Sequence, residues 1–259
     1  MITLYDNGFS PFARKVRLVL DHKGLAYEVL DGLLHANRDA LAKVNGRVEV
    51  PAIDHDGTIV VGSSDIVAYL ERVAREPAMY PNDDAAWVRA RAWERCADSV
   101  IDPILINISY WTWAERPDAM PEAWLAAARA DLEVVYAALE RDLEGKPFVC
   151  GTLSIADIAL FPHLTATRTF GLGHDPARYP RLHDWLKRLR AMKVFAADFE
   201  RTRTFMSTFF TQNEHERKKI FWRGDRIEWV LAHGFHEWLH REIVEERVLW
   251  PGLGVPGPA

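Results

Sequence analysis

Apolar and polar residues follow two different periods along this chain, and the change from one to the other divides it. Up to about residue 80, short apolar runs bounded by turn residues alternate with segments in which apolar residues recur every three or four positions. The short runs predict strands, and the longer period predicts helices. The expected order is β-α-β-α-β-β-α, with strands at residues 2–5, 25–30, 51–54 and 59–61, and helices from Ser10-Pro11 to Gly24, at 37–44 and at 63–75.

The first three of these elements form a βαβ unit. A helix between two strands predicts parallel pairing through a right-handed crossover. Gly24 stands where a helix C-terminal glycine is expected. Between the last two strands, the Asp56-Gly57 pair is the sequence signal of a tight hairpin. The first part of the chain is therefore predicted to be an α+β domain.

Strand patterns disappear after residues 76–81, where alanine-, leucine- and arginine-rich helical patterns take over. The spacing predicts helices at residues 83–114 with a kink at Pro103, and at 121–143, 154–169, 179–192 and 195–208. Ser154 and Asp157 form a capping box at the third of them. Two more helices are expected at 214–221 and 225–247, before a Pro/Gly-rich tail. We predict three parts: residues 1–76, an all-helical domain at 82–208, and a helical extension with its tail at 209–259.

Composition narrows the class of protein. A chain of 259 residues with 49% hydrophobic and 27% charged residues is typical of one large or two smaller globular domains. A net charge of −5 gives no general attraction for nucleic acid. The two cysteines, Cys96 and Cys150, fit a reducing compartment and exclude a disulfide framework or a Cys-rich zinc site. Without a signal-peptide pattern or an apolar run of membrane length, we expect a cytoplasmic protein with neither nucleic acid nor membrane as partner.

Ser10 is the residue on which the chemical interpretation depends. Followed by Pro11, it is typical of a helix N-cap, which is a purely structural role. The same geometry places a hydroxyl at the positive end of a helix, with Arg14 one turn further on, where it can stabilise a thiolate that arrives from outside. Lowering a thiol pKa by ~2 units requires about 2.7 kcal/mol, within reach of one charge-assisted hydrogen bond and a helix dipole.

Three segments, residues 10–17, 45–53 and 63–70, together resemble the glutathione-binding half of a cytosolic glutathione transferase. Residues 152–159 are similar to the helix-start motif in that family's second domain, so the resemblance covers about residues 1–200. It implies a thioredoxin-like α+β domain followed by an all-α domain, a homodimer and a role in detoxification. Serine at position 10 makes the chain look like the serine-type, bacterial-like classes, here with a C-terminal extension.

The resemblance also implies roles for individual residues. Ser10 would hold the glutathione sulfur. The Val50-Pro51 bond would be cis, with the Val50 backbone against the cysteinyl part, and Ser63 would contact the γ-glutamyl carboxylate. Further glutathione contacts are expected from Phe12, His35, Arg47, Gly62 and Ser64.

The sequence departs from the family pattern at both ends of the tripeptide. Gly62 replaces the usual acidic residue, so one contact to the γ-glutamyl group is missing or is supplied by Ser64 or Asp65. Glu49 occupies a glutamine-like position and is a poor neighbour for the glycyl carboxylate, which His35 or Arg47 could bind instead. These changes predict weak binding of glutathione or a modified pose.

The reaction expected of such a site is attack by the glutathione thiolate on a small, mostly apolar electrophile, by addition or by displacement. We expect the electrophile between the two domains, because pockets often form at such junctions. The lining candidates are aromatic: Phe9, Phe12, Tyr110, Trp111 and Trp113. No metal is expected in this chemistry.

Two other interpretations stay open. The first is a non-catalytic binding or assembly protein that keeps the transferase fold and uses Ser10 only as a cap. The second is a zinc hydrolase, because His236, Glu237 and His240 match the H-E-x-x-H pattern, although Ile243 stands where the longer motif needs glycine. A glutathione-dependent reductase is disfavoured, since that chemistry needs a cysteine at position 10.

Overall fold

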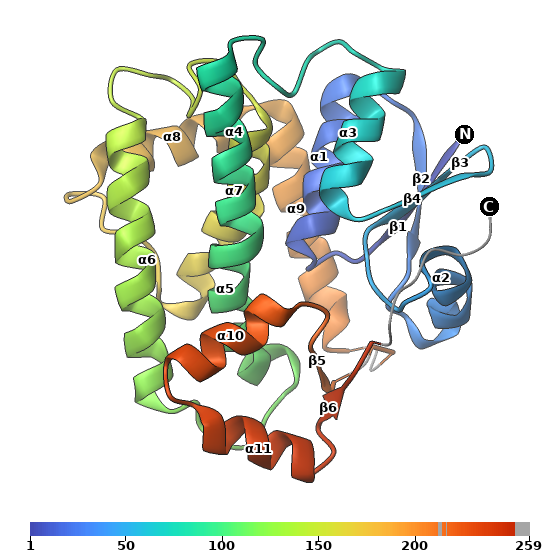
Figure 1. The fold of residues 1–259 in the computed structure, drawn as a ribbon, viewed down its shortest axis with the longest axis vertical. Helices are drawn as coiled ribbons and strands as arrows, with labels where there is room; N and C mark the ends of the chain where they lie inside the picture. Colours follow the sequence, from blue (N-terminus) through green and yellow to red (C-terminus); the bar gives the residue numbers. More distant parts are fainter. Residues whose placement is uncertain (212–213, 216, 252–259) are drawn as a thin grey trace. The chain divides into compact units, whose positions relative to one another are not determined.

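The computed structural model describes residues 1–211, 214–215 and 217–251 (Figure 1). Contacts divide the chain into two compact units, which we call the N-terminal unit (residues 1–79, 190–216 and 251–259) and the helical unit (residues 80–189 and 217–250). Residues 190–208, expected in the helical domain, group here with the N-terminal residues. The three-part division at 1–76, 82–208 and 209–259 stays a prediction.

The N-terminal unit contains a mixed four-stranded sheet in the order β2-β1-β3-β4. Strand β1 pairs in parallel with β2 and antiparallel with β3, and β3 pairs antiparallel with β4. Asp56 and Gly57 form the hairpin turn between the last two strands with φ values of 51° and 89°, as a tight hairpin of this kind requires. The strands are β1 (Ile2–Asp6), β2 (Tyr27–Asp31), β3 (Ala52–His55) and β4 (Thr58–Val61).

Four α-helices complete this unit. Helices α1 and α3 lie side by side on one face of the sheet, and α2 lies at the other face (Figure 1). Helix α9 packs against α1. The helices are α1 (Pro11–Lys23), α2 (Arg38–Asn45), α3 (Ser63–Val73) and α9 (Lys193–Phe209), with a short 3-10 turn, η1 (His35–Asn37), before α2. The element order agrees with the prediction, which is therefore confirmed for the α+β part.

A buried ionic network joins α9 to α1. Asp198 of α9 accepts hydrogen bonds from Arg14 Nε (3.0 Å) and Nη2 (2.7 Å), and from Arg17 Nη2 (3.3 Å). Arg17 also bonds Asp6 at the end of β1 (2.6 Å). All four side chains are buried. Each charge thus has a partner, which buried charges require.

The helical unit begins with one long helical stretch. It consists of α4 (Asp84–Cys96), a π-helical segment η2 (Ala97–Ile101) and α5 (Asp102–Trp113). Pro103 lies in the first turn of α5, directly after the π-helical segment. The helix is therefore irregular directly before Pro103, which stands in a first turn where a missing amide costs least, and the kink expected there stays a prediction.

The remaining helices of this unit follow the predicted spacing. Ser154 caps α7, and Asp157 reaches back to the Ser154 amide (3.0 Å), so the capping box is confirmed. Asp157 is fully buried and also accepts from Val149 N and Trp185 Nε1. The helices are α6 (Glu122–Asp142), α7 (Ile155–Ala166), the 3-10 turn η3 (Thr167–Phe170) and α8 (Pro180–Ala191). None of the helices in the described ranges is both long and apolar enough to cross a membrane.

The extension departs from two expectations. The helix expected at 214–221 is wrong: the described residues there contain β5 (Lys219–Ile220), which pairs in parallel with β6 (Val248–Leu249). The helix expected at 225–247 is divided into α10 (Gly224–Ala232) and α11 (His236–Val244). Gly234 interrupts it with φ at +78°, a conformation that favours glycine.

Candidate functional site

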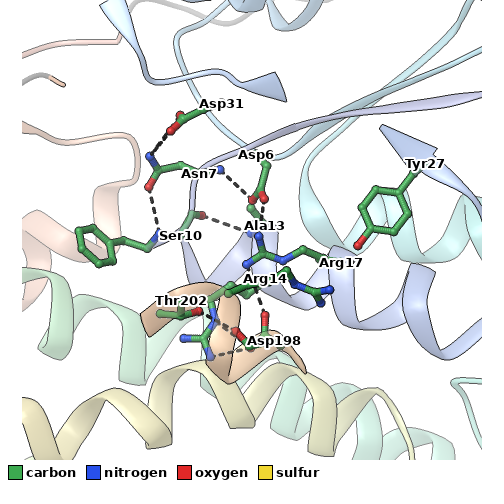
Figure 2. Close-up of polar contacts among 12 residues, drawn as sticks. Asp6, Asn7, Ser10, Ala13, Arg14, Arg17, Tyr27, Asp31, Asp198 and Thr202 are labelled. Atoms are coloured by element: carbon green, nitrogen blue, oxygen red, sulfur yellow. Dashed lines mark hydrogen bonds and ion pairs between the residues drawn. The ribbon is translucent and has the colours of Figure 1, made fainter. Parts of the chain in front are cut away.

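The N-terminal end of α1 holds Ser10 as expected. Its Oγ accepts a hydrogen bond from Ala13 N at 3.3 Å, and Pro11 takes the first helical position. The Ser10 amide donates to the Asn7 carbonyl at 2.9 Å, which closes the turn before the helix. Figure 2 shows this turn, with Asn7 between Ser10 and Asp31. The side chain is thus fixed at the positive end of the helix dipole.

Arg14 does not have the role expected beside Ser10. Its guanidinium donates the two hydrogen bonds described above to one carboxylate oxygen of Asp198, Oδ2 (Figure 2). The positive charge is largely neutralised by that carboxylate. The helix amides and the serine hydroxyl, rather than Arg14, are therefore the groups at this helix end that can stabilise an anion.

The peptide bond between Val50 and Pro51 is cis, as the resemblance implied. It lies directly before β3, and the Pro51 carbonyl accepts from the Gly62 amide at 3.3 Å. Val50 is buried against Leu41 and Ala52. The loop that ends at this bond is further held by Asn45, whose side-chain amide donates to the Glu49 carbonyl.

The start of α3 brings two serines and a lysine together. Ser63 is the first helical residue and is buried, and no side chain caps this helix end. The Lys15 ammonium, itself 1% exposed, donates to Ser64 Oγ at 3.3 Å. Gly62 precedes them with φ at +83°. First-turn helix amides next to a buried cation are a suitable environment for a carboxylate.

The two residues expected at the glycyl carboxylate lie on either side of α2 in the sequence, His35 before this helix and Arg47 in the loop after it. His35 is exposed, and its backbone amide donates to the Glu214 carbonyl at 3.0 Å. Arg47 Nε lies 3.4 Å from a Glu49 carboxylate oxygen. The Glu49 carboxylate, an unfavourable neighbour for the glycyl carboxylate, is therefore paired with Arg47 in the same loop. This pairing offsets part of the positive charge of Arg47.

Phe9 and Phe12 lie on either side of Ser10 in the sequence but in different surroundings. Phe9 packs edge to face against Phe205 and Phe209 of α9, with ring centroids 4.9 and 4.7 Å apart. Phe12 is buried on α1, with the Lys15 ammonium 6.0 Å from its ring centroid. The aromatic side chains of Phe205 and Phe209 on α9 therefore lie next to the Ser10 turn.

The aromatic residues expected in the substrate pocket from α5 lie in the helical unit. Tyr110 and Trp111 are buried there, and both rings contact Trp238 of the extension. Tyr110 donates to Glu242 (3.1 Å), and the buried Lys219 ammonium lies 4.8 Å from its ring centroid. Trp113 is half-buried. The structure therefore gives Tyr110 and Trp111 a packing role in the core of this unit.

The H-E-x-x-H residues lie on α11, where His236, Glu237 and His240 are exposed. Within the described ranges, no group of three or more His, Cys, Asp or Glu side chains is arranged to hold a metal ion. Trp238, Leu239 and Glu242 form the buried side of this helix. The pattern follows the polar face of an amphipathic helix.

Four residues of this region were not singled out from the sequence. Asn7, Asp31 and Lys15 support the Ser10 turn or the start of α3, and His215 bonds Asp31 from beyond α9. Lys15 shared the motif with Ser10, and its charge within an apolar helix face could have marked it. Asp31 and His215 are 184 positions apart, and no local pattern connects them.

Two family models match the chain. One, described as glutathione S-transferase, N-terminal domain, matches residues 4–78, and the other, described as glutathione S-transferase, C-terminal domain, matches residues 122–188. The second contains the capping box of Ser154 and Asp157. The first contains Ser10, the cis bond and the start of α3.

The chain is also similar to individual proteins and to solved structures. The chain is 33% identical over 195 residues to the probable glutathione S-transferase GSTU6 of Oryza sativa subsp. japonica, covering 70% of this chain and 81% of that protein. A glutathione S-transferase structure from Rhodospirillum rubrum F11 matches with a TM-score of 0.68 at 23% identity, covering 76% and 91% of the two chains. The β-etherase LigF from Sphingobium sp. strain SYK-6 matches with a TM-score of 0.67 at 23% identity, covering 77% and 98%. These structures share its fold, a thioredoxin-like domain followed by a helical one.

Proposed function

The chain belongs to the glutathione transferase family, an enzyme family that uses glutathione as co-substrate, and we propose that Ser10 holds the glutathione sulfur as a thiolate for attack on an electrophile. The proposal goes beyond family membership because it assigns the activation of the thiol to one hydroxyl. It is supported by the position of that hydroxyl at the amino end of α1.

The hydrogen bonding of Ser10 is the observation that carries this proposal. A hydroxyl has one donor hydrogen and two acceptor lone pairs. In the described part of the chain, Ser10 Oγ uses one lone pair to accept from Ala13 N, and its hydrogen remains available. A thiolate is an acceptor, whereas a thiol is a poor one. The O–H therefore favours the ionised form of a sulfur placed against it, and the helix dipole adds to this effect.

The remainder of glutathione is proposed to lie along the loop ends that follow. The Val50 backbone beside cis Pro51 would pair with the cysteinyl peptide group. Ser63, Ser64 and the first-turn amides of α3 would bind the γ-glutamyl carboxylate, and the buried Lys15 places a positive charge beside them. For the glycyl carboxylate we retain His35 and Arg47.

The reaction is a transfer in which the sulfur supplies the electron pair. The thiolate forms a carbon–sulfur bond with an electrophilic carbon, and either a leaving group departs with its bonding pair or the adduct takes up a proton. Among the residues proposed to line the electrophile site, Phe9 and Phe12 flank Ser10 in the sequence. Such a lining suits a small, mostly apolar substrate. A homodimeric, cytoplasmic detoxification enzyme is the form we propose.

The test compares the wild type with Ser10→Ala. We expect loss of the hydroxyl to lower turnover of an aromatic halide by about 10- to 1000-fold, the range that removal of one donor to a developing or stabilised anion produces. Retention on immobilised glutathione should change little, since Ser10 contacts only the sulfur. Ultraviolet absorbance of bound thiolate, titrated against pH, should show a higher apparent pKa in the variant.

Ser10→Thr is the matched control, because it keeps the hydroxyl and the cap. Equal turnover by the wild type and Ser10→Ala would overturn the proposed role of Ser10. Absence of turnover in both proteins, with glutathione still retained, would favour the non-catalytic binding protein.

A further inference from the structure

We propose that His215 is a positioning residue for Ser10: through Asp31 and Asn7 it fixes the turn that presents the serine hydroxyl to the glutathione sulfur. This inference rests on the proposed function of Ser10. It assigns a role in the reaction to the segment that follows α9, outside the residues matched by either family model.

His215 is held against the N-terminal unit by its backbone and by its ring. It forms an isolated antiparallel bridge with Leu34, and the neighbouring Glu214 carbonyl accepts from the His35 amide at 3.0 Å. The ring packs on Phe209 and Phe205, with centroids 4.9 and 5.7 Å away. His215 is only 5% exposed. A side chain so enclosed has little freedom to point elsewhere.

The first link is from His215 to Asp31. His215 Nε2 lies 3.0 Å from Asp31 Oδ2, and a carboxylate acceptor assigns the ring hydrogen to Nε2. The other oxygen, Asp31 Oδ1, accepts from Leu33 N at 3.0 Å and from Asn7 Nδ2 at 3.3 Å. Asp31 therefore accepts from His215 at Oδ2 and from Asn7, the residue that begins the Ser10 turn, at Oδ1.

The second link is from Asn7 to the helix start. Asn7 Oδ1 accepts from Phe9 N at 3.2 Å, and the Asn7 carbonyl accepts from Ser10 N at 2.9 Å. The Asn7 amide donates to Asp6 Oδ1 at 2.8 Å. Figure 2 shows Asn7 between Asp31 and the Ser10 turn. Side chain and backbone of one residue thus connect Asp31 to Phe9 and Ser10, the two residues directly before α1.

The charges of Asp6 and Asp31 explain why loss of the His215 hydrogen bond should affect the Ser10 turn. Asp6 and Asp31 stand opposite each other at the ends of β1 and β2. Arg17 pairs with Asp6, and in the described residues His215 is the side chain of basic type that bonds Asp31. Without the His215 donor, Asp31 loses a hydrogen bond at Oδ2, and the side chain that still donates to it is the amide of Asn7, beside the backbone amide of Leu33. A shift of the Ser10 turn follows, and displacement of a catalytic group by about 1 Å lowers rates by up to ~100-fold.

The test uses His215→Phe, which keeps an aromatic ring against Phe209 and removes the donor, and His215→Gln, whose amide nitrogen can replace Nε2. We expect His215→Phe to lower kcat about 10-fold, to raise the apparent pKa of the bound glutathione thiol, and to leave the glutathione KM within about twofold. His215→Gln should recover most of both losses. A purely structural role of His215 would lower the melting temperature without this division between kcat and KM.

A double-mutant cycle with Ser10→Ala separates this inference from the proposed function. If His215 acts through Ser10, His215→Phe should have no further effect on kcat in the Ser10→Ala background. Independent, multiplicative effects of the two substitutions would overturn the role of His215 while leaving that of Ser10 intact. Should Ser10→Ala itself be without effect, the proposed function would be the part that fails.

Two further variants serve as a control and as a substitute in this experiment. Arg203→Ala changes an exposed residue of α9 whose ion pair within the described residues is with the exposed Glu200, and its kinetics should equal those of the wild type. If His215→Phe does not fold, His215→Asn serves in its place, because its shorter side chain cannot reach Asp31. Wild-type kinetics in a folded His215→Phe or His215→Asn protein would contradict the proposal.

Discussion

At the scale of single residues, Gly8 shows how closely α9 approaches the Ser10 turn. A Cβ atom built on Gly8 would lie 2.3 Å from Phe205 Cγ and 2.8 Å from Phe205 Cβ. Because these atoms are near the root of the side chain, rotation about its outer bonds does not relieve the overlap. We expect Gly8→Ala to lower the free energy of unfolding by about 1–3 kcal/mol, as overpacking does, measured by urea denaturation.

Two controls test the stated cause of that loss. In a Phe205→Ala background the overlap is gone, so the added effect of Gly8→Ala should fall below about 1 kcal/mol or reverse in sign. Gly224→Ala, at the start of α10 with open space around the new Cβ, should be neutral or stabilising. An equal loss in both backgrounds would show that Phe205 is not the obstacle.

Residues with a local signal were predictable from sequence. Ser10 followed by Pro11 identifies a helix start, and together with Val50-Pro51 and Ser63 it forms a motif that the family models also match. The partner of Arg14 was not predictable, because Asp198 lies 184 positions away and resembles any other acidic helical residue. Burial, which separates Asp198 from its exposed neighbour Glu200, is a property of the folded chain.

At the scale of elements, α9 is attached to α1 by the buried carboxylate of Asp198. Removing it leaves Arg14 and Arg17 with fewer partners in a buried place, and loss of one side of a buried pair costs about 3–5 kcal/mol. We expect Asp198→Ala to destabilise by that amount in urea denaturation. Glu200→Ala, on the same helix but exposed, and paired among the described residues with the exposed Arg203, should change stability by less than about 0.5 kcal/mol. Similar losses in the two variants would contradict an ionic attachment of α9.

Elements with a long apolar period were predicted well, and those of the extension were not. The pattern at residues 225–247 continues through Gly234, so only the folded backbone, with φ at +78° there, separates α10 from α11. At residues 219–220 the chain pairs with residues 248–249, a contact that no helical or strand period in so short a segment can indicate. Tertiary pairing overrides local preference most easily where the segment is short.

At the scale of the whole molecule, buried tyrosines make the stability of the fold depend on pH in the alkaline range. Burial raises the pKa of Tyr110 and of Tyr136 to about 12, and it raises that of Tyr27 as well. A tyrosine in the unfolded chain ionises near pH ~10, so between about pH 10 and 12 the unfolded state has lost protons that the folded state keeps. Stability therefore falls as the pH rises through this window, and each of Tyr110 and Tyr136 contributes about 1.4 kcal/mol of loss by pH ~11.

Tyr136→Phe isolates one of these contributions. Near pH 8 the variant should be less stable than the wild type by about 1 kcal/mol, because the hydroxyl donates to the Leu172 carbonyl at 2.6 Å. At pH ~11 the wild type has lost about 1.4 kcal/mol that phenylalanine cannot lose, so the difference should vanish or change sign. Urea denaturation of both proteins across this range measures it, with Tyr110→Phe as a second case. A difference that stays constant from pH 8 to 11 would mean that the hydroxyl titrates alike in the folded and unfolded chains.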